Sequence, residues 1–402
     1  MSPRRRNFLK LLIPLAAALL CLAALEIAVR VLCRVDVDGG AWFRETRLKP
    51  YRLPVRRAKQ QVAAYLATPA SALIYDSALG WSQRPGVADH NDAGFITTGP
   101  TPPRERSADR LRIALFGDSF TQGNFRTGWW RVLEEQLNVA GVKCEVLNFG
   151  VGGYGMDQAY LRWQRDGAPW RPQIVVFGFF AEDCYRNVNT LRLLRDPDSG
   201  IPFMKPRFVP EGDDLKLINS PVPEPPRVSG ILATFLHPPN ADPWPLREHD
   251  YYFREADFRM NAWRWSRLAA LVEAKATLAG DAADSATFFR PEGEASRIAL
   301  GLMRRMRAEV EASGARFLVA HLPGEKELAN LRRSGLMPHQ ALYKTLRHEQ
   351  TVIALEPALL AAAQGHELRE FFRDAHYAGA FNAIVGKQLA EALLRDFRTE
   401  SK

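Results

Sequence analysis

The sequence has few cysteines, no nucleotide-binding motif and no spacing typical of metal ligands. Only 4 of its 402 residues are Cys, and two of them, Cys21 and Cys33, lie in the apolar N-terminal segment. The other two, Cys144 and Cys184, allow either one disulfide or a pair of buried thiols, so cysteine usage does not identify the redox compartment. A phosphate-binding loop, a dinucleotide fingerprint and an internal repeat are also absent from the sequence. We therefore predict neither a cofactor nor a bound metal.

Most of the chain has no excess of basic charge, although the net charge is +9. Residues 1–60 contain 13 of the 54 Lys and Arg residues and 4 of the 45 Asp and Glu residues. The rest of the chain therefore has 41 basic and 41 acidic residues. The body of the protein is therefore neutral, without the basic excess that binds nucleic-acid backbones. The positive N-terminal segment is expected to meet anionic lipid head groups.

The N-terminus has the pattern of a membrane anchor. Residues 4–10 hold three Arg and one Lys, an uninterrupted apolar run follows over residues 11–25, and a looser run continues to residue 33. A basic segment before an apolar one is typical of a secretory signal or a signal anchor. No small-x-small cleavage site ends the run, so we predict an uncleaved anchor over residues 1–33. We expect the body to lie on the periplasmic face of a bacterial inner membrane, although basic residues 30–59 leave a cytoplasmic orientation open.

The rest of the chain divides into a connector and one large domain. Residues 34–74 form a basic connector, with a helix expected near residues 57–67. Residues 75–400 are predicted to form the domain. Between about 186 and 290 the sequence is rich in proline and aromatic residues and lacks clear periodicity. We interpret this stretch as an insertion over the active-site face rather than as an independent domain.

Strand and helix patterns alternate through the remainder of the domain. This alternation predicts an α/β fold, a three-layer α/β/α sandwich with a mainly parallel sheet, preceded by one N-terminal transmembrane helix. Such sheets bind ligands at the carboxyl ends of their strands. The third strand is apolar on both faces, so we expect it at the centre of the sheet. The predicted strands are 111–116, 144–148, 173–180, 315–321 and 351–355, and the predicted helices are 128–140, 156–165, 262–278, 294–313 and 379–397.

A serine follows the first predicted strand directly, in the sequence Gly-Asp-Ser-Phe-Thr. A serine hydroxyl is a weak nucleophile that must be held at an exposed turn beside a base. Gly117 permits a tight turn, and the amide of Ser119 can then face a pocket as an oxyanion donor. Asp118 would line the same pocket. The tripeptide alone fits equally well a simple helix cap by Asp118 or Ser119.

Two further elements lie at the ends of predicted strands or near the C-terminus. The glycine-rich stretch 148–155 suggests backbone that approaches a ligand closely, or a loop that only allows tight helix packing. Asp374-Ala375-His376 precedes the closing helix. A histidine is the usual base for a serine, and a carboxylate can fix its tautomer, but taken alone His376 is an ordinary surface histidine. His321, at the end of the fourth strand, is expected to be a core histidine rather than a pocket residue.

Taken together, these elements resemble the SGNH/GDSL hydrolase family. Residues 113–123 (IALFGDSFTQG) resemble the first block of that family, in which Ser119 would be the nucleophile. Gly153 resembles the second-block glycine, whose amide is an oxyanion donor. The resemblance implies that Asp374 and His376 are the terminal acid and base. No cofactor is implied.

The third block departs from the family pattern. That block is usually Gly-x-Asn-Asp, in which the Asn amide donates to the oxyanion, whereas here Glu182 or Asp183 stands at the Asn position, depending on the alignment. An ionised carboxylate only accepts hydrogen bonds. Asn187 or Asn189 could supply the donor instead, burial could protonate the carboxyl, two backbone donors could suffice, or the protein is slow or inactive.

The resemblance covers residues 75–185 and 295–397, and it implies a serine esterase acting on an acylated envelope glycan or lipid, in which the acyl group is expected to be acetyl. Envelope proteins similar to this chain also include O-acetyltransferases of polysaccharides, and alginate O-acetyltransferases similarly combine Gly-Asp-Ser-Phe with a membrane anchor. Transfer onto a polysaccharide is therefore an alternative, and it would need an acyl donor supplied by a membrane partner. A third hypothesis is an inactive module that binds glycan through residues 186–290.

Overall fold

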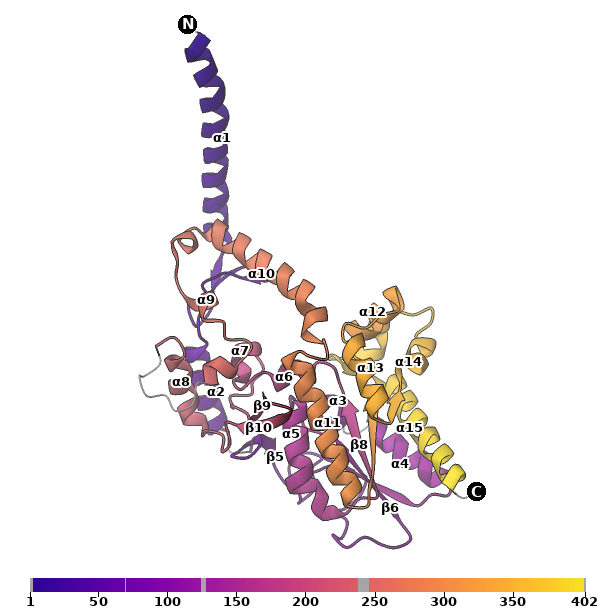
Figure 1. Ribbon diagram of the computed structural model, residues 1–402. Coiled ribbons are helices and arrows are strands. Elements are labelled where there is room, and N and C mark those ends of the chain that lie inside the picture. Colours follow the sequence, from indigo (N-terminus) through magenta and orange to yellow (C-terminus); the bar gives the residue numbers. More distant parts are fainter. Residues whose placement is uncertain (1–2, 69, 124–127, 238–245, 401–402) are drawn as a thin grey trace.

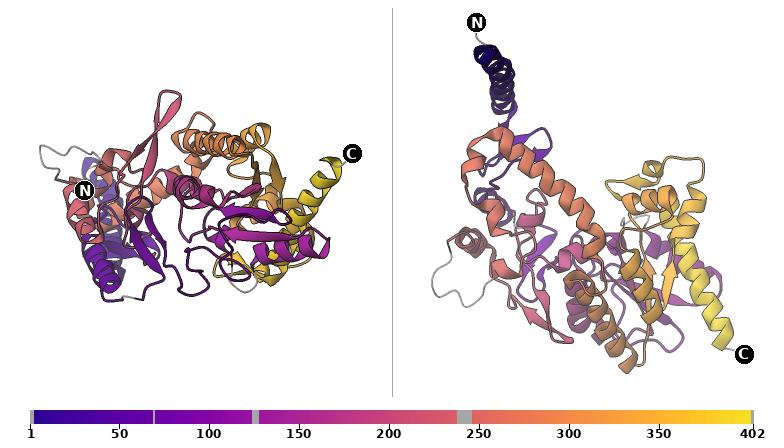
Figure 2. Two further views of the ribbon diagram at one scale, coloured as in Figure 1. Left: turned by 90° about the horizontal axis from the view of Figure 1, so that it is seen from below. Right: turned by 45° about the horizontal axis from the view of Figure 1, so that its top comes forward.

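The computed structural model describes residues 3–68, 70–123, 128–237 and 246–400 (Figure 1). Its N-terminal helix α1 (Pro3–Leu32) projects from the body, which consists of an α/β sandwich and a smaller part beside it (Figures 1 and 2). Residues 12–32 of α1 are long and apolar enough to cross a membrane, and almost none of this stretch is buried in the protein. A secretory signal has the same properties.

The core of the sandwich is a five-stranded sheet in the order β12-β11-β8-β6-β7, in which every neighbouring pair is parallel. This arrangement confirms the predicted fold class. The completely buried β8 lies in the middle, as its two apolar faces predict. The bounds are β6 (Leu111–Phe116), β7 (Cys144–Asn148), β8 (Ile174–Phe179), β11 (Arg316–His321) and β12 (Val352–Ala354), within one residue of the predicted strands at each end.

Helices cover both faces of the sheet. On one face α4 (Trp129–Val139) packs closely against α15 (Gly379–Glu400), and their apolar residues share one buried cluster. On the other face α5 (Met156–Arg162) and α11 (Glu294–Ala312) share a second cluster. All four helices lie where the sequence predicts them, although α5 continues as a π-helical turn over Trp163–Gly167.

The segment between β11 and α15 contains structure that the sequence analysis did not predict. Three helices lie there, followed by a short 3₁₀ helix and a two-stranded hairpin (Figure 1). Their bounds are α12 (Glu325–Ser334), α13 (Gln340–Glu349), α14 (Glu356–Ala362), η5 (Leu368–Phe371), β13 (Phe372–Arg373) and β14 (His376–Tyr377).

The N-terminal connector folds together with the insertion. The predicted helix in the connector is α2 (Val55–Leu66), and it packs against α8 (Pro225–Thr234) of the insertion. The long helix α10 (Arg267–Phe288) of the insertion contacts α1. The remaining elements here are β1 (Arg34–Val35), β2 (Ala41–Phe43), β3 (Thr46–Arg47), β4 (Leu73–Asp76), β5 (Gly80–Gln83), α6 (Asp183–Asn187), α7 (Arg192–Arg195), β9 (Arg207–Glu211), β10 (Asp214–Ile218), η3 (Leu246–His249), α9 (Glu255–Phe258) and η4 (Ala262–Trp265).

The predicted location of the insertion over the active-site face is wrong for the cavity beside Ser119, which no described residue of the insertion lines. The first part of the insertion does reach the glycine-rich loop after β7, where Arg192 donates to the carbonyl of Gly153 and Ile201 packs with Val151 and Tyr154. Strand β9 packs on α5 and α11, and α10 lies between α1 and the sandwich (Figures 1 and 2). The physical reason is that the apolar residues of the insertion complete a core with the connector, which cannot bury its own apolar side chains. That core includes Ala58, Val228 and Leu232.

The two cysteines of the body are buried free thiols and form no disulfide. Burial, followed by the negative charge of Glu134, raises the pKa of Cys144 to about 12. The second of the two alternatives left open by the sequence is therefore the correct one.

Candidate active site

Ser119 begins a four-residue helix, α3 (Ser119–Gln122), at the carboxyl end of β6. Gly117 forms the turn with φ +153°, and a Cβ atom there would lie 2.1 Å from Oγ1 of Thr121, so only glycine fits. The side chain of Asp118 caps the helix by accepting a hydrogen bond from the amide of Phe120 at 2.8 Å. The amide of Ser119 makes no hydrogen bond within the described part of the chain.

His376 meets Ser119 across 257 residues of sequence. Its Nε2 atom lies 2.8 Å from Oγ of Ser119, a hydrogen-bond distance suited to proton transfer. The 3.5 Å contact between Oγ of Ser119 and Oδ2 of Asp118 is too long to compete. The sequence therefore identified two residues that the fold brings into direct contact.

A tight hairpin presents His376 to the serine. Strands β13 and β14 pair with Arg373 opposite His376, and Asp374 and Ala375 form the loop between them. Both loop residues have positive φ, +49° and +63°, as a two-residue type I′ turn requires. Aspartate tolerates this conformation better than most residues do. The turn folds the backbone carbonyl of Asp374 back toward the imidazole.

Asp374 contacts His376 through its backbone and not through its carboxylate. Nδ1 of His376 lies 2.7 Å from the carbonyl oxygen of Asp374. The Asp374 side chain is exposed and makes no hydrogen bond or ion pair with any described residue. The carbonyl can fix the tautomer of His376 with a proton on Nδ1 and a lone pair on Nε2. The role of the carboxylate that the resemblance implies therefore remains a prediction.

The glycine-rich loop after β7 lies against the turn that carries Ser119. A Cβ atom on Gly150 would lie 2.4 Å from the amide nitrogen of Gln122, so the two backbones pack without room for a side chain. The amide of Gly152 donates to Oε1 of Gln122 at 3.0 Å. The amide of Gly153, like that of Ser119, makes no hydrogen bond to any residue that the structure describes. Two backbone donors thus remain for an oxyanion.

The acidic residues of the third block differ in environment. Glu182 is half exposed and its Oε2 atom pairs with Nη2 of Arg195 at 2.6 Å. Asp183 is buried. Asn187, the predicted substitute donor, is also buried, and its Oδ1 atom accepts the amide of Met156 at 2.8 Å. Neither Glu182 nor Asn187 lines the cavity beside Ser119.

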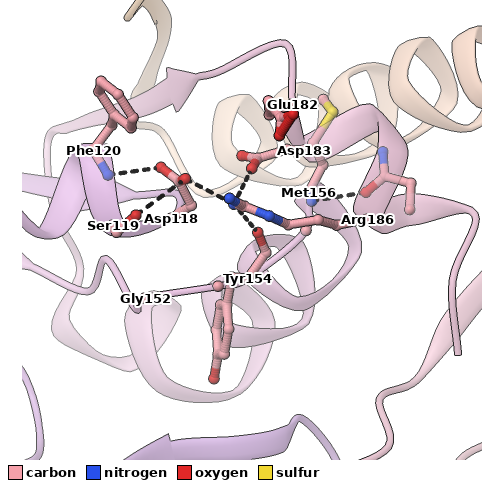
Figure 3. Close-up of polar contacts among 12 residues, drawn as sticks. Asp118, Ser119, Phe120, Gly152, Tyr154, Met156, Glu182, Asp183 and Arg186 are labelled. Carbon is pink, nitrogen blue, oxygen red and sulfur yellow. Dashed lines mark hydrogen bonds and ion pairs between the residues drawn. The ribbon is translucent and has the colours of Figure 1, made fainter. Parts of the chain in front are cut away.

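Arg186 is a site residue that the sequence analysis missed. Figure 3 shows its guanidinium between Asp118 and Asp183, which it contacts through Nη1 at 2.8 and 2.5 Å, and the same atom donates to the carbonyl of Tyr154 at 2.9 Å. Burial and then the charge of Asp118 raise the pKa of Asp183 well above its usual value. The spacing of Asp183 and Arg186, three residues apart on a helix, was the signal available in the sequence.

A surface cavity of about 720 Å³ opens beside Ser119 and His376. It is lined by residues of the serine turn, of the hairpin and of the start of α15, and no lining residue comes from the insertion. The lining residues are Ser119, Gln122, Gly123, Glu370, Phe372, Arg373, Asp374, His376, Tyr377, Ala378 and Gly379. His321 is completely buried and does not line the cavity, consistent with the prediction of a core histidine.

No protein-family model and no curated protein matches the chain. Among solved structures, an acetyl xylan esterase named AlAXEase is 13% identical with a TM-score of 0.37, over 70% of this chain and 100% of its own. The acetylxylan esterase Axe2 from Geobacillus stearothermophilus is 12% identical with a TM-score of 0.36, over 71% and 94%. A structure from Desulfitobacterium hafniense, described as a lipolytic protein of the G-D-S-L family, is 12% identical with a TM-score of 0.33, over 70% of this chain and 98% of its own.

Similarity at this level does not transfer an activity from those proteins to this chain. The chain itself has a parallel five-stranded sheet, with Ser119 directly after the long strand β6 and His376 shortly before the last helix, α15. These two side chains are in contact. In fold and in the order of its motifs, the chain resembles the SGNH/GDSL hydrolases.

Proposed function

We propose that this protein is a membrane-anchored serine esterase of the SGNH/GDSL type, which removes acyl groups from an acylated envelope glycan or lipid. The 2.8 Å contact between Oγ of Ser119 and Nε2 of His376, at the edge of an open cavity, is the observation that carries the proposal. A serine hydrogen-bonded to a histidine base is the arrangement that activates a hydroxyl for attack on an ester carbonyl.

The proposed reaction proceeds through an acyl-enzyme. His376 takes the proton of Ser119 as Oγ attacks the ester carbonyl, and the amides of Ser119 and Gly153 stabilise the oxyanion. His376 then gives that proton to the leaving alcohol. Water enters, gives a proton to His376 and attacks the acyl-enzyme, and the return of that proton to Ser119 restores the free enzyme as the acid leaves. The carbonyl of Asp374 keeps His376 in the required tautomer, and the exposed Asp374 carboxylate makes only a small contribution to the stability of the imidazolium.

The buried charges around Arg186 support the same mechanism. Asp118 adjoins the nucleophile and is completely buried, so its carboxylate needs a cationic partner. Arg186 supplies it and also donates to the carbonyl of Tyr154, in the loop that holds Gly153. One guanidinium therefore connects the serine turn to the loop with the second oxyanion donor. We propose that Arg186 positions these two backbone segments relative to each other.

We further propose that α1 is a retained anchor rather than a cleaved signal. Near its end, the Glu26 carboxylate accepts hydrogen bonds from the amides of Arg267 and Leu268, at 2.9 and 2.8 Å, and from the hydroxyl of Ser266 at 2.7 Å. Arg30 donates to the carbonyl of Trp265 at 2.6 Å. These contacts cap the start of α10 from within α1, so cleavage after Arg30 would remove a part of the folded body.

The residues next to this junction suit a membrane interface. Trp263 and Trp265 are 78% and 71% exposed on η4, immediately before α10. Tryptophan is enriched where a protein meets the boundary between lipid and water. We therefore propose that Trp263 and Trp265 face the bilayer surface. We also propose, from the order of basic and apolar residues at the N-terminus, that the body lies on the periplasmic side.

The proposal is tested with p-nitrophenyl acetate and the full chain in detergent. We expect turnover by the wild type, loss of at least about 10³-fold in kcat/KM for Ser119→Ala, and no change for Ser334→Ala, an exposed serine outside the cavity. Equal turnover by wild type and Ser119→Ala would contradict the proposal. Adding oligosaccharide distinguishes water from a sugar as the acyl acceptor: acetylated oligosaccharide would show transfer, and unchanged acetate release supports hydrolysis.

A further inference from the structure

A second polar cluster is completely enclosed beyond the end of β11. It consists of His321 at the end of that strand, Glu327 on α12 and His339 immediately before α13. Their exposed fractions are 0%, 7% and 1%. The ligand atoms of these three side chains lie within 4.8 Å of one another. None of the three lines the cavity at Ser119, so the cluster is separate from the proposed active site.

The short contacts inside this cluster converge on one carboxylate oxygen. Oε1 of Glu327 lies 2.7 Å from Nε2 of His321 and 3.1 Å from Nε2 of His339. All three atoms are nevertheless buried without a hydrogen-bond partner among the described residues. Buried polar atoms without partners are rare and costly in native proteins. Three of them that converge on one point indicate a missing common partner.

The surroundings of His321 fix the direction of its free lone pair. Its Nδ1 atom lies 3.0 Å from Oε2 of Glu356, and Oε1 of Glu356 accepts the hydroxyl of Tyr343 at 3.0 Å. A carboxylate on Nδ1 holds the proton there and leaves the Nε2 lone pair directed at Glu327. This carboxylate-histidine pair is the outer support that metal-binding histidines usually have.

Charge also calls for a cation. The carboxylates of Glu327 and Glu356 are both buried, and no Lys or Arg in the described ranges forms an ion pair with either of them. One divalent ion would neutralise the two carboxylates. A proton on Nε2 of His321 is the competing cation, but it would leave Nε2 of His339 without a partner.

We propose that His321, Glu327 and His339 bind one divalent transition-metal ion of the Zn²⁺ type, with water as the fourth ligand and with Glu356 as outer support. Two imidazole nitrogens and one carboxylate oxygen match the ligand preference of zinc, which binds them at about 2.0–2.2 Å. Such bond lengths separate neighbouring ligand atoms by about 3.3 Å in tetrahedral geometry. Metal binding would therefore open the two short contacts to Glu327 by a few tenths of an ångström.

The proposed ion would hold α12 and the start of α13 against the end of β11 and would brace the base of the active site. His321 belongs to β11, Glu327 to α12, and His339 adjoins α13. The hydroxyl of Tyr377 donates to the carbonyl of Pro323 at 2.8 Å, between the first two ligands. Tyr377 follows His376 directly, so the metal site would stabilise the position of the base without touching the reacting atoms.

The test uses the full chain in detergent, freed of metal with a chelator and dialysed against buffer. We expect the wild type to bind one Zn²⁺ per chain, measured by elemental analysis, and to unfold at a higher temperature with Zn²⁺. His339→Gln and Glu327→Gln should each weaken Zn²⁺ binding by at least about 100-fold. His366→Gln should bind Zn²⁺ like the wild type, because His366 is an exposed histidine whose imidazole pairs with Glu370, outside the cluster.

A second measurement needs no variant and so does not depend on how the substitutions fold. Co²⁺ added to the metal-free wild type should give the visible absorption bands of a tetrahedral site, and one equivalent of Zn²⁺ should remove them. Failure of the metal-free wild type to bind Zn²⁺ or Co²⁺ would overturn the proposal and leave His321 as a protonated core histidine. Binding by His339→Gln equal to that of the wild type would overturn it as well. Neither readout depends on esterase activity.

Discussion

Nδ1 of His376 lies 2.7 Å from the backbone carbonyl oxygen of Asp374, while the Asp374 carboxylate is exposed. A carbonyl holds the histidine tautomer as well as a carboxylate does, but it contributes less to the stability of an imidazolium. We therefore expect Asp374→Asn to lower kcat by less than about 10-fold, against about 10⁴-fold where a buried carboxylate supports the histidine. Steady-state hydrolysis of p-nitrophenyl acetate measures this difference.

Asparagine is the appropriate substitution because it also tolerates the positive φ of this turn. His376→Gln serves as the comparison, since it removes the base and should abolish turnover. A loss of about 10³-fold or more in the Asn variant, with normal folding, would show that the carboxylate turns toward His376 during the reaction. That outcome would restore the acid role implied by the family resemblance.

Glu182 gives a test of whether the third block supplies an oxyanion donor. Its carboxylate pairs with Arg195 at 2.6 Å and does not line the cavity beside Ser119. An Asn amide at this position can donate a hydrogen bond but lies away from the reacting atoms. We therefore expect Glu182→Asn and Glu182→Ala both to leave kcat/KM for p-nitrophenyl acetate within about 3-fold of the wild type, because one oxyanion donor would be worth about 10²–10³. A gain of about 10-fold or more in the Asn variant alone would show that position 182 reaches the oxyanion.

Asp183 makes stability depend on pH. Burial and the charge of Asp118 raise its pKa in the folded state, so the folded protein holds a proton that the unfolded chain has already lost. Stability must therefore fall as the pH rises from about 4, the ordinary pKa of Asp, to the raised value, and must stay level above it. Asp183→Asn removes this dependence.

Chemical unfolding at several pH values between 4 and 8 measures the effect. The Asn variant should lose less stability than the wild type as the pH rises through this range. Asp213→Asn, at an exposed position, should follow the wild type and corrects for the other titrating groups. Parallel curves for all three proteins would mean that Arg186 keeps Asp183 ionised at every pH tested.

The sequence predicted the sheet and the two reacting side chains because both depend on local patterns. Short runs of mostly apolar residues identified the long strands to within one residue, and β8, which is apolar on both faces, lies at the centre of the sheet as expected. Ser119 and His376 were recognised by their motifs. The contribution of the Asp374 carbonyl was not, because a backbone contact leaves no signal in the residue type.

Arg186 and the cluster around His321 depend on tertiary contacts between segments far apart in sequence. Arg186 belongs to no recognisable motif, and its role follows from the ion pair with the buried Asp118, 68 positions earlier in the sequence. His321, Glu327 and His339 are separated by six and twelve positions and lie on a strand and beside or on two helices, so they match no local metal motif. The insertion was misplaced for a related reason: its apolar residues match the connector, more than a hundred positions earlier.

The contact between Glu26 and the start of α10 predicts how the anchor is joined to the body. Glu26→Ala removes the three hydrogen bonds that the carboxylate accepts from residues 266–268, each ordinarily worth about 1.5–3 kcal/mol, together with a fourth from Arg30, and it leaves the first amides of α10 uncapped. We expect tryptic cleavage after Arg34 to become at least several-fold faster in detergent, while esterase activity stays unchanged because the catalytic residues lie in the sandwich. Glu45→Ala, an exposed acid of the connector, should be cleaved like the wild type. Equal cleavage rates for all three proteins would mean that α1 is attached only through the chain, and would remove the structural support for a retained anchor.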